Sequence, residues 1–190
     1  MILTQWRAHR ANRRLIDQLH GKIVAAARRP GLYVELGAPD SYDGRFEMVT
    51  LFAGLVLRRL TRLPGIGAEL ADELVDSVFQ HFEVALREIG VGDVGVPKRL
   101  KRMAESFYGR NRAYGQGLDE PNSDRLAEAL TRNVYGVGDV ALAPKARRLA
   151  QLVRATAEAL DRTPLETFAS GEVEFPDLQP ALPTIEGEHG

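Results

Sequence analysis

The chain has 190 residues, a length that fits one domain, or one domain with a tail. Hydrophobic residues make up 44% of it and charged residues 27%, which supplies a buried core and excludes a chain that is disordered throughout. With 25 basic and 26 acidic residues the net charge is −1, so the chain is not a uniformly basic nucleic-acid coat.

Cysteine is absent, which excludes disulfides, thiolate nucleophiles, Cys-ligated zinc sites and iron–sulfur clusters. No two of the four histidines stand three or four residues apart, so a helical His-pair metal site is excluded as well; they are His9, His20, His81 and His189. We therefore expect neither a metal nor a cofactor.

The longest uncharged apolar stretch, residues 48–57, is half as long as the about 20 residues that a membrane-spanning helix needs. The first residues are rich in arginine and lack the apolar region that follows the basic start of a secretory signal. These observations predict a cytoplasmic protein, with peripheral attachment to the inner membrane as an alternative.

Hydrophobic periodicity predicts an all-α protein, with about six helices in one compact domain that spans residues 1–170. The first helix covers about 4–29 and has a basic outer face. A loop follows over 31–44, in which residues 32–36 could form a short extended piece. The next helix, about 45–62, is apolar nearly all round and is expected to be the most buried element.

The third helix, about 68–89, carries an acidic stripe opposite its apolar face, formed by Glu69, Asp72, Glu73 and Asp76. Like charges one helical turn apart cost about a few tenths of a kcal/mol per pair. We therefore infer that a basic group lies near this stripe, on a neighbouring helix or on a partner.

Three further helices complete the predicted domain: one opens at Pro97, and the others cover about 123–135 and 144–161. A last short turn covers 163–168. The final stretch, 171–190, contains three prolines, five acids and no Lys or Arg, which predicts an acidic, extended tail outside the domain.

Two glycine-containing loops resemble ligand-binding motifs. Residues 90–95 match the dinucleotide-binding pattern letter for letter, but a helix precedes them where that motif needs a strand, so a tight interhelical loop is the better interpretation. Leu63–Gly67 resembles a helix-hairpin-helix motif, which gives a nucleic-acid-binding protein as the alternative function. The acidic stripe that follows this loop would repel a phosphate backbone, and we expect no DNA binding.

Basic residues concentrate in two stretches. Residues 1–29 contain seven Lys or Arg and one acid, and residues 97–112 contain six and one. These faces are solvated surfaces, or they contact ribosomal RNA, an anionic membrane surface or a partner protein. No catalytic set of residues can be assembled from the sequence, so we expect a protein that acts through its surfaces and not an enzyme.

Three stretches, in this order and spacing, carry a resemblance to a known family: GLYVELGAPDSYDGRF (31–46), LVLRRL (55–60) and LREIGVGDVGVPKRLKRMAESFYGR (86–110). Over roughly residues 10–155 the chain resembles the ubiquinol–cytochrome c chaperone family. The resemblance implies a non-enzymatic assembly factor for the respiratory cytochrome bc1 complex. Such a factor binds newly made cytochrome b near the ribosome exit tunnel and holds it for haem loading.

If these stretches mark the working surface, the resemblance implies a partner-binding role for residues in two of them. The first stretch contributes Tyr33 and Arg45, next to Asp43 and Phe46, whose side chains equally suit a helix cap and a core anchor. The stretch 86–110 contributes Lys98, Lys101, Arg102, Tyr108 and Arg110.

Overall fold

The computed structural model describes residues 2–136 and 142–177, with side chains from residue 12 onward. Throughout these residues the regular structure is helical, which confirms the all-α prediction. The elements in chain order are α1 (Ile2–Ala27), α2 (Pro30–Val34), α3 (Tyr42–Leu60), α4 (Gly67–Glu88), α5 (Val96–Asp119), α6 (Arg125–Leu130), the π-helical turn η1 (Thr131–Tyr135), α7 (Ala143–Arg162) and α8 (Leu165–Ala169).

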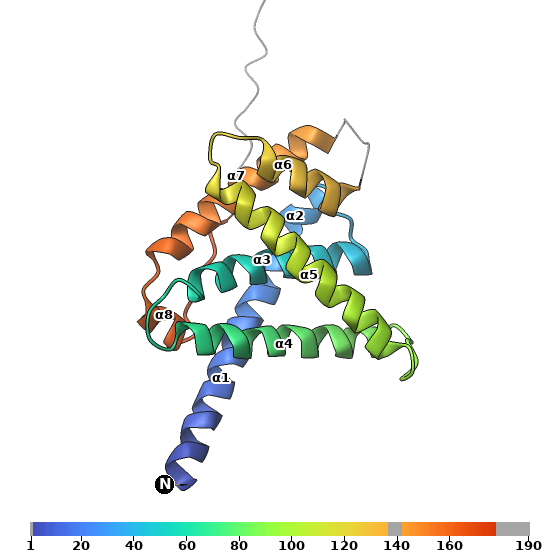
Figure 1. The fold of residues 1–190 in the computed structure, drawn as a ribbon. Helices are drawn as coiled ribbons and strands as arrows, with labels where there is room; N and C mark the ends of the chain where they lie inside the picture. Colours follow the sequence, from blue (N-terminus) through green and yellow to red (C-terminus); the bar gives the residue numbers. More distant parts are fainter. Residues whose placement is uncertain (1, 137–141, 178–190) are drawn as a thin grey trace, which may run out of the picture.

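The helices form one body, from which the first turns of α1 project (Figure 1). The predicted third, fourth and sixth helices are α4, α5 and α7, the predicted fifth is α6 with η1, and the predicted last turn is α8. None of the described helices is long and apolar enough to cross a bilayer.

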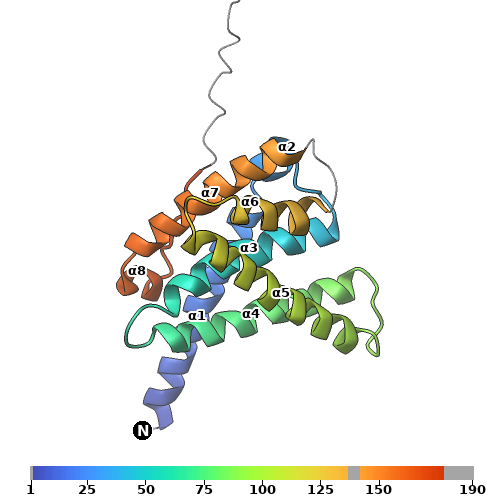
Figure 2. The same ribbon diagram turned by 45° about the horizontal axis from the view of Figure 1, so that its top comes forward.

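Helix α3 lies at the centre of the fold, as its sequence predicted. It contacts α1, α4, α5 and α7, and Figure 2 shows α1 and α5 on opposite sides of it. Its uninterrupted run from Phe46 to Ala53 is buried. Eight consecutive residues are more than two full turns, so this segment of the helix has no solvent face.

Residues 30–34 form the helix α2, so the short extended piece expected within 32–36 is wrong. Leu32 and Leu36 are both buried, whereas Val34 between them is 80% exposed. Apolar residues four apart share one side of a helical turn, while a strand would have placed all three on one face. Pro30 opens the turn, where its missing N–H costs nothing and its ring presets a helical φ.

The packed body continues past the predicted domain boundary, into the stretch that the sequence assigned to the tail. Val173 and Phe175 are buried, and the Phe175 ring meets Phe52 of α3 edge to face, with 5.6 Å between the ring centroids. Arg29, just after α1, donates hydrogen bonds to the backbone oxygen of Phe175, at 2.8 Å, and to that of the next residue. The predicted tail residues 178–190 lie outside the described residues.

The start of α3 depends on a glycine. A Cβ atom built on Gly44 lies 1.8 Å from the backbone oxygen of Pro39, which cannot move aside as a side chain would. We expect Gly44→Ala to lower the free energy of unfolding by about 1–3 kcal/mol, the usual cost of overpacking, as measured by urea unfolding.

The matched control is Gly109→Ala in the middle of α5, where nothing lies within 4 Å of an added Cβ. This change should raise the free energy of unfolding by about 0.5–1 kcal/mol, because alanine favours a helix over glycine. Equal effects of the two substitutions would contradict the close approach at Gly44.

Candidate functional site

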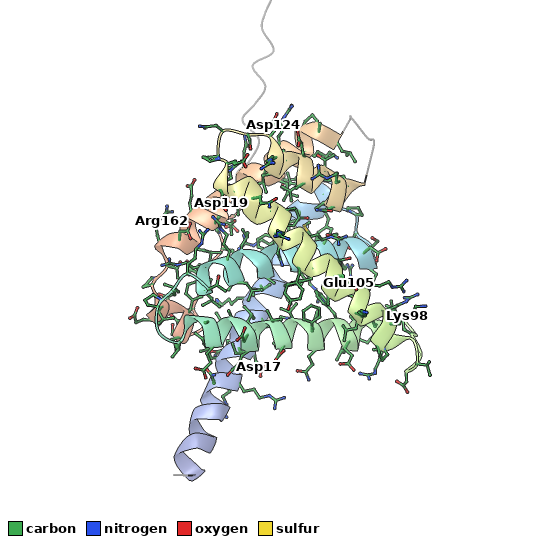
Figure 3. All side chains as sticks on the ribbon, in the orientation of Figure 1. Asp17, Lys98, Glu105, Asp119, Asp124 and Arg162 are labelled. Carbon is green, nitrogen blue, oxygen red and sulfur yellow. The ribbon has the colours of Figure 1, made fainter. Side chains whose placement is uncertain are left out.

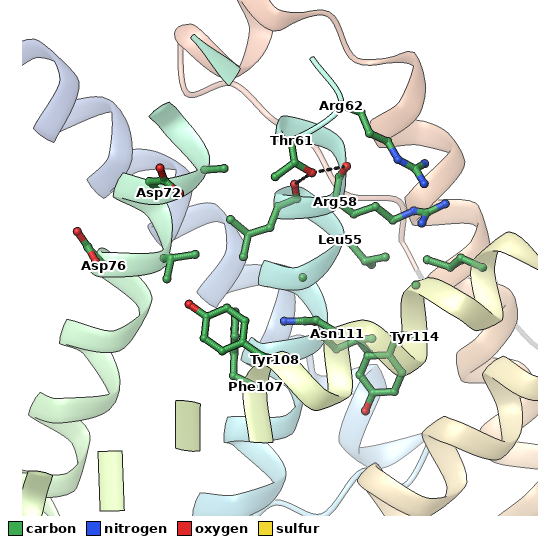
Figure 4. A pocket seen from close by; sticks show the side chains of 17 residues that line it. Leu55, Arg58, Thr61, Arg62, Asp72, Asp76, Phe107, Tyr108, Asn111 and Tyr114 are labelled. Atoms are coloured by element: carbon green, nitrogen blue, oxygen red, sulfur yellow. Dashed lines mark hydrogen bonds between the residues drawn. The ribbon is translucent and has the colours of Figure 1, made fainter. Parts of the chain in front are cut away.

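A cavity of about 690 Å³ opens at the surface between α3, α4 and α5, and we call it the groove (Figure 4). The second half of α3 forms its floor, α4 and α5 form its two walls, and most of the exposed lining is apolar. Apolar side chains come from all three helices, among them Leu51, Leu55, Val75, Phe107 and Leu118. This combination suits an apolar segment that lies along the helices.

The two sides of the groove carry opposite charges. Asp72 and Asp76 of the acidic stripe stand on the α4 side, and Arg58 and Arg62 at the end of α3 stand across from them (Figure 4). Both arginines bond to Asp119, at 2.8 and 3.4 Å, and the hydrogen bond from Arg58 lowers the pKa of that carboxyl. The basic side is therefore partly neutralised within the fold.

The acidic side is not neutralised in this way. Among the described side chains, no Lys or Arg forms an ion pair with any member of the acidic stripe. Glu73 accepts a hydrogen bond of 2.5 Å from the neutral amide of Asn12 on α1. We expected a basic group near this stripe, on a neighbouring helix or on a partner. The described side chains of the neighbouring helices form no ion pair with it.

The floor of the groove contains a close contact between α3 and α5. A Cβ atom on Gly54 would lie 1.8 Å from the Oδ1 atom of Asn111, so only glycine admits this amide. The Nδ2 atom of Asn111 is buried and has no hydrogen-bond partner. A buried donor without a partner costs about 1–3 kcal/mol. The wall of the groove therefore contains one unsatisfied hydrogen-bond donor, the Asn111 amide nitrogen.

A second cavity, of about 580 Å³, lies between the start of α3 and α5. It brings together four residues that the sequence singled out: Asp43, Phe46, Arg102 and Arg110. The Arg110 guanidinium lies 5.6 Å from the centre of the Phe46 ring, and its Nε atom donates to a carboxylate oxygen of Glu47 at 2.5 Å.

The sequence reasoning missed Glu47. This side chain is buried, and burial raises the pKa of its carboxyl to about 7, although the hydrogen bond from Arg110 acts in the opposite direction. The available signal was the one acid of the predicted helix 45–62, which is apolar nearly all round and where an ionisable group needs a partner.

The other predicted partner-binding residues are spread over the surface. The hydroxyl of Tyr33 donates to the backbone oxygen of Ala27 at 2.7 Å, which ties α2 to α1. Arg45 is exposed and pairs with Asp40 at 2.8 Å. Tyr108 is 57% exposed at the edge of the groove.

Lys98, Lys101 and Arg102 lie on the exposed face of α5, near the end that Figure 3 marks with Lys98. The structure therefore divides the seven predicted residues among the groove, the second cavity and separate surface positions. They do not form one site.

His20 and His81, the two histidines whose side chains the structure describes, form a packing contact. The rings of His20 on α1 and His81 on α4 lie 5.1 Å apart, edge to face, and His20 shares a hydrogen bond of 2.8 Å with Ser77. Burial, followed by the neighbouring His81, lowers the pKa of His20 to about 4, so this ring is neutral near pH 7. Within the described residues, no group of three or more His, Asp or Glu side chains could hold a metal ion.

The loop Leu63–Gly67 joins α3 to α4 as an interhelical turn. Gly65 has a φ of +73°, and a Cβ on Gly67 would lie 2.5 Å from the backbone oxygen of Leu60. Both glycines are thus required by the turn itself, without a bound phosphate.

The raised pKa of Glu47 predicts a pH-dependent stability. Because the folded-state pKa lies above the unfolded value of 4.5, the carboxyl favours the folded state most below about pH 4.5 and loses this contribution as the pH rises through about 7. Glu47→Gln should remove up to about 3 kcal/mol of this pH dependence, measured as the difference in unfolding free energy from the unmodified chain between pH 4.5 and 8. A constant difference over that range would show that the Glu47 carboxyl has the same pKa in the folded and unfolded states.

Comparisons with known proteins agree with the architecture. The sequence model of the ubiquinol–cytochrome c chaperone family matches residues 34–175, about three quarters of the chain. The crystal structure of the Cbp3 homolog from Brucella abortus matches with a TM-score of 0.84 and 37% sequence identity, over 94% of this chain and 98% of that one. A comparison with curated proteins gave no match. The chain belongs to the ubiquinol–cytochrome c chaperone family.

Proposed function

We propose that this chain binds newly made cytochrome b as its client and holds it during assembly of the cytochrome bc1 complex. Membership of a family of chaperones supports this role, and it favours a protein that acts through its surfaces over an enzyme. The groove between α3, α4 and α5 is the observation that carries the proposal, since a chaperone for a membrane protein needs an apolar surface that stays open.

The charges around the groove specify the kind of segment that fits it. An apolar client segment would cover the floor, and basic residues at its end would lie against Asp72 and Asp76, which have no ion-pair partner among the described side chains. Membrane-spanning helices carry this pattern, because Lys and Arg flank their apolar core on the cytoplasmic side. A partner of this kind would also supply a basic group to the acidic stripe, which has no ion pair with the Lys and Arg side chains that the structure describes.

The alternative of a nucleic-acid binder that uses Leu63–Gly67 has no observation in its favour. The glycines of this loop are explained by packing, and the family is one of chaperones. Contact with the ribosome near its exit tunnel remains a prediction for the basic faces of α1 and α5, separate from the client site.

Site-specific photo-crosslinking in the native host tests the proposal. Probes at Val75 and Tyr108 lie on the two walls of the groove, and a probe at Val34, on α2 and outside the groove, is the control. Mass spectrometry should identify cytochrome b on the groove probes and not on the control probe. Efficient capture of other proteins alone would overturn the assignment of this client.

Tyr108→Asp should weaken client capture without unfolding the protein. The tyrosine is more than half exposed, so its loss removes little core packing, while an added carboxylate disrupts an apolar contact. We expect capture at the Val75 probe to fall by at least about fivefold, since an aromatic contact at an interface contributes more than about 1 kcal/mol. The matched control is Val84→Asp, an exposed apolar residue of α4 outside the groove, and equal capture by the two variants would count against the groove.

A further inference from the structure

The turn between α4 and α5, together with the first turns of α5, forms a projecting corner of the molecule, residues 89–102 (Figure 1). We infer that this α4–α5 corner docks on a bilayer surface that contains anionic lipids. The inference goes beyond the client-binding role and does not depend on it.

The corner presents apolar side chains that the described fold leaves fully or half exposed. Val94 is 97% exposed, the highest value among the large exposed hydrophobic residues described, and Ile89 is 51% exposed. The chain turns at Gly90, with a φ of +85°, and the Gly95 N–H donates to the backbone oxygen of Gly92 at 2.7 Å. These turns hold Val94 away from the core, so its side chain is available to another surface.

The corner is also basic. It contains one acid and four cations, and the cations are Lys98, Arg99, Lys101 and Arg102, all exposed on the first turns of α5. Among the described side chains none of the four forms an ion pair, whereas the acid, Asp93, lies 3.6 Å from Arg87 of α4. Lys98, Lys101 and Arg102 follow the spacing of one helical face, so they can approach a flat surface together.

An anionic bilayer uses both properties of the corner. Each Lys or Arg near such a surface contributes about 1 kcal/mol, and an apolar tip gains free energy by entering the boundary between headgroups and acyl chains. Ribosomal RNA would use the cations alone, because unpaired bases stack on aromatic rings and residues 89–102 include none. The exposed valine and isoleucine therefore favour a lipid surface over RNA.

Vesicle flotation tests this inference with the full chain. The probes are vesicles of phosphatidylglycerol mixed with phosphatidylcholine, and vesicles of phosphatidylcholine alone. The chain should bind the mixed vesicles and not the neutral ones. Lys98→Glu with Lys101→Glu should weaken binding at least about tenfold, since each cation contributes about fivefold in affinity. Val94→Ser should weaken it at least about threefold, because an apolar contact is lost.

Matched variants separate the corner from general effects of charge and hydrophobicity. Arg147→Glu with Arg162→Glu makes the same change in net charge on exposed positions of α7, and Val34→Ser removes an equally small apolar side chain from α2. Both controls should bind as the unmodified chain does, and circular dichroism should show the same melting temperature for all variants.

Three outcomes would overturn the inference. The first is no binding to the mixed vesicles, or equal binding to the neutral ones. The second is equal vesicle binding by the Lys98→Glu, Lys101→Glu variant and its α7 control variant. The third is a charge reversal that weakens binding while Val94→Ser leaves it unchanged, because the contact would then be electrostatic alone. A parallel titration with a ribosomal RNA fragment would identify RNA as the ligand in that last case.

Discussion

The burial of α3 on nearly every side constrains the rest of the fold. A helix with eight consecutive buried residues must be surrounded, and α1, α4, α5 and α7 do this. Its segment 46–53 is buried, while its second half lines the groove between α4 and α5. The same helix therefore supplies both the centre of the core and the floor of the candidate client site.

Polar groups enter this apolar centre where α3 meets α5. Arg110 pairs with Glu47 and lines the second cavity, and the next residue, Asn111, packs on Gly54 and lines the groove. These two consecutive residues of α5 separate the two cavities. Consecutive side chains of a helix point about 100° apart, so Arg110 reaches the buried Glu47 carboxyl while Asn111 lies at the wall of the groove.

The sequence was sufficient for the helices and for the most buried element, because helical periodicity and a helix that is apolar all round are local signals. It misjudged residues 32–36, where three alternating apolar residues resemble a strand until Leu32 and Leu36 are seen to share one side of a helical turn. The groove could not be predicted, since it depends on how three helices separated in the chain leave space between them. Glu47 was missed because the apolar pattern of the predicted helix 45–62 concealed the one acid within it.

The predicted partner-binding residues illustrate the same limit. Lys98, Lys101 and Tyr108 recur on one exposed face of α5, and the sequence alone could group them. Tyr33 and Arg45 both lie in the stretch 31–46, yet one bonds to α1 and the other to Asp40. The two residues were grouped because they lie close together in the chain. In the folded protein each of them makes a separate local contact.

The contact between Arg29 and the backbone of Phe175 joins residues 146 positions apart. On a ribosome, the chain emerges from its N-terminus, so α1 must wait for almost the entire described sequence before this contact can form. Contacts between such distant residues carry a large loop-closure cost and slow the final folding step. The core is therefore complete only after Phe175 has emerged, and until then Phe52 of α3 lacks the ring that packs against it.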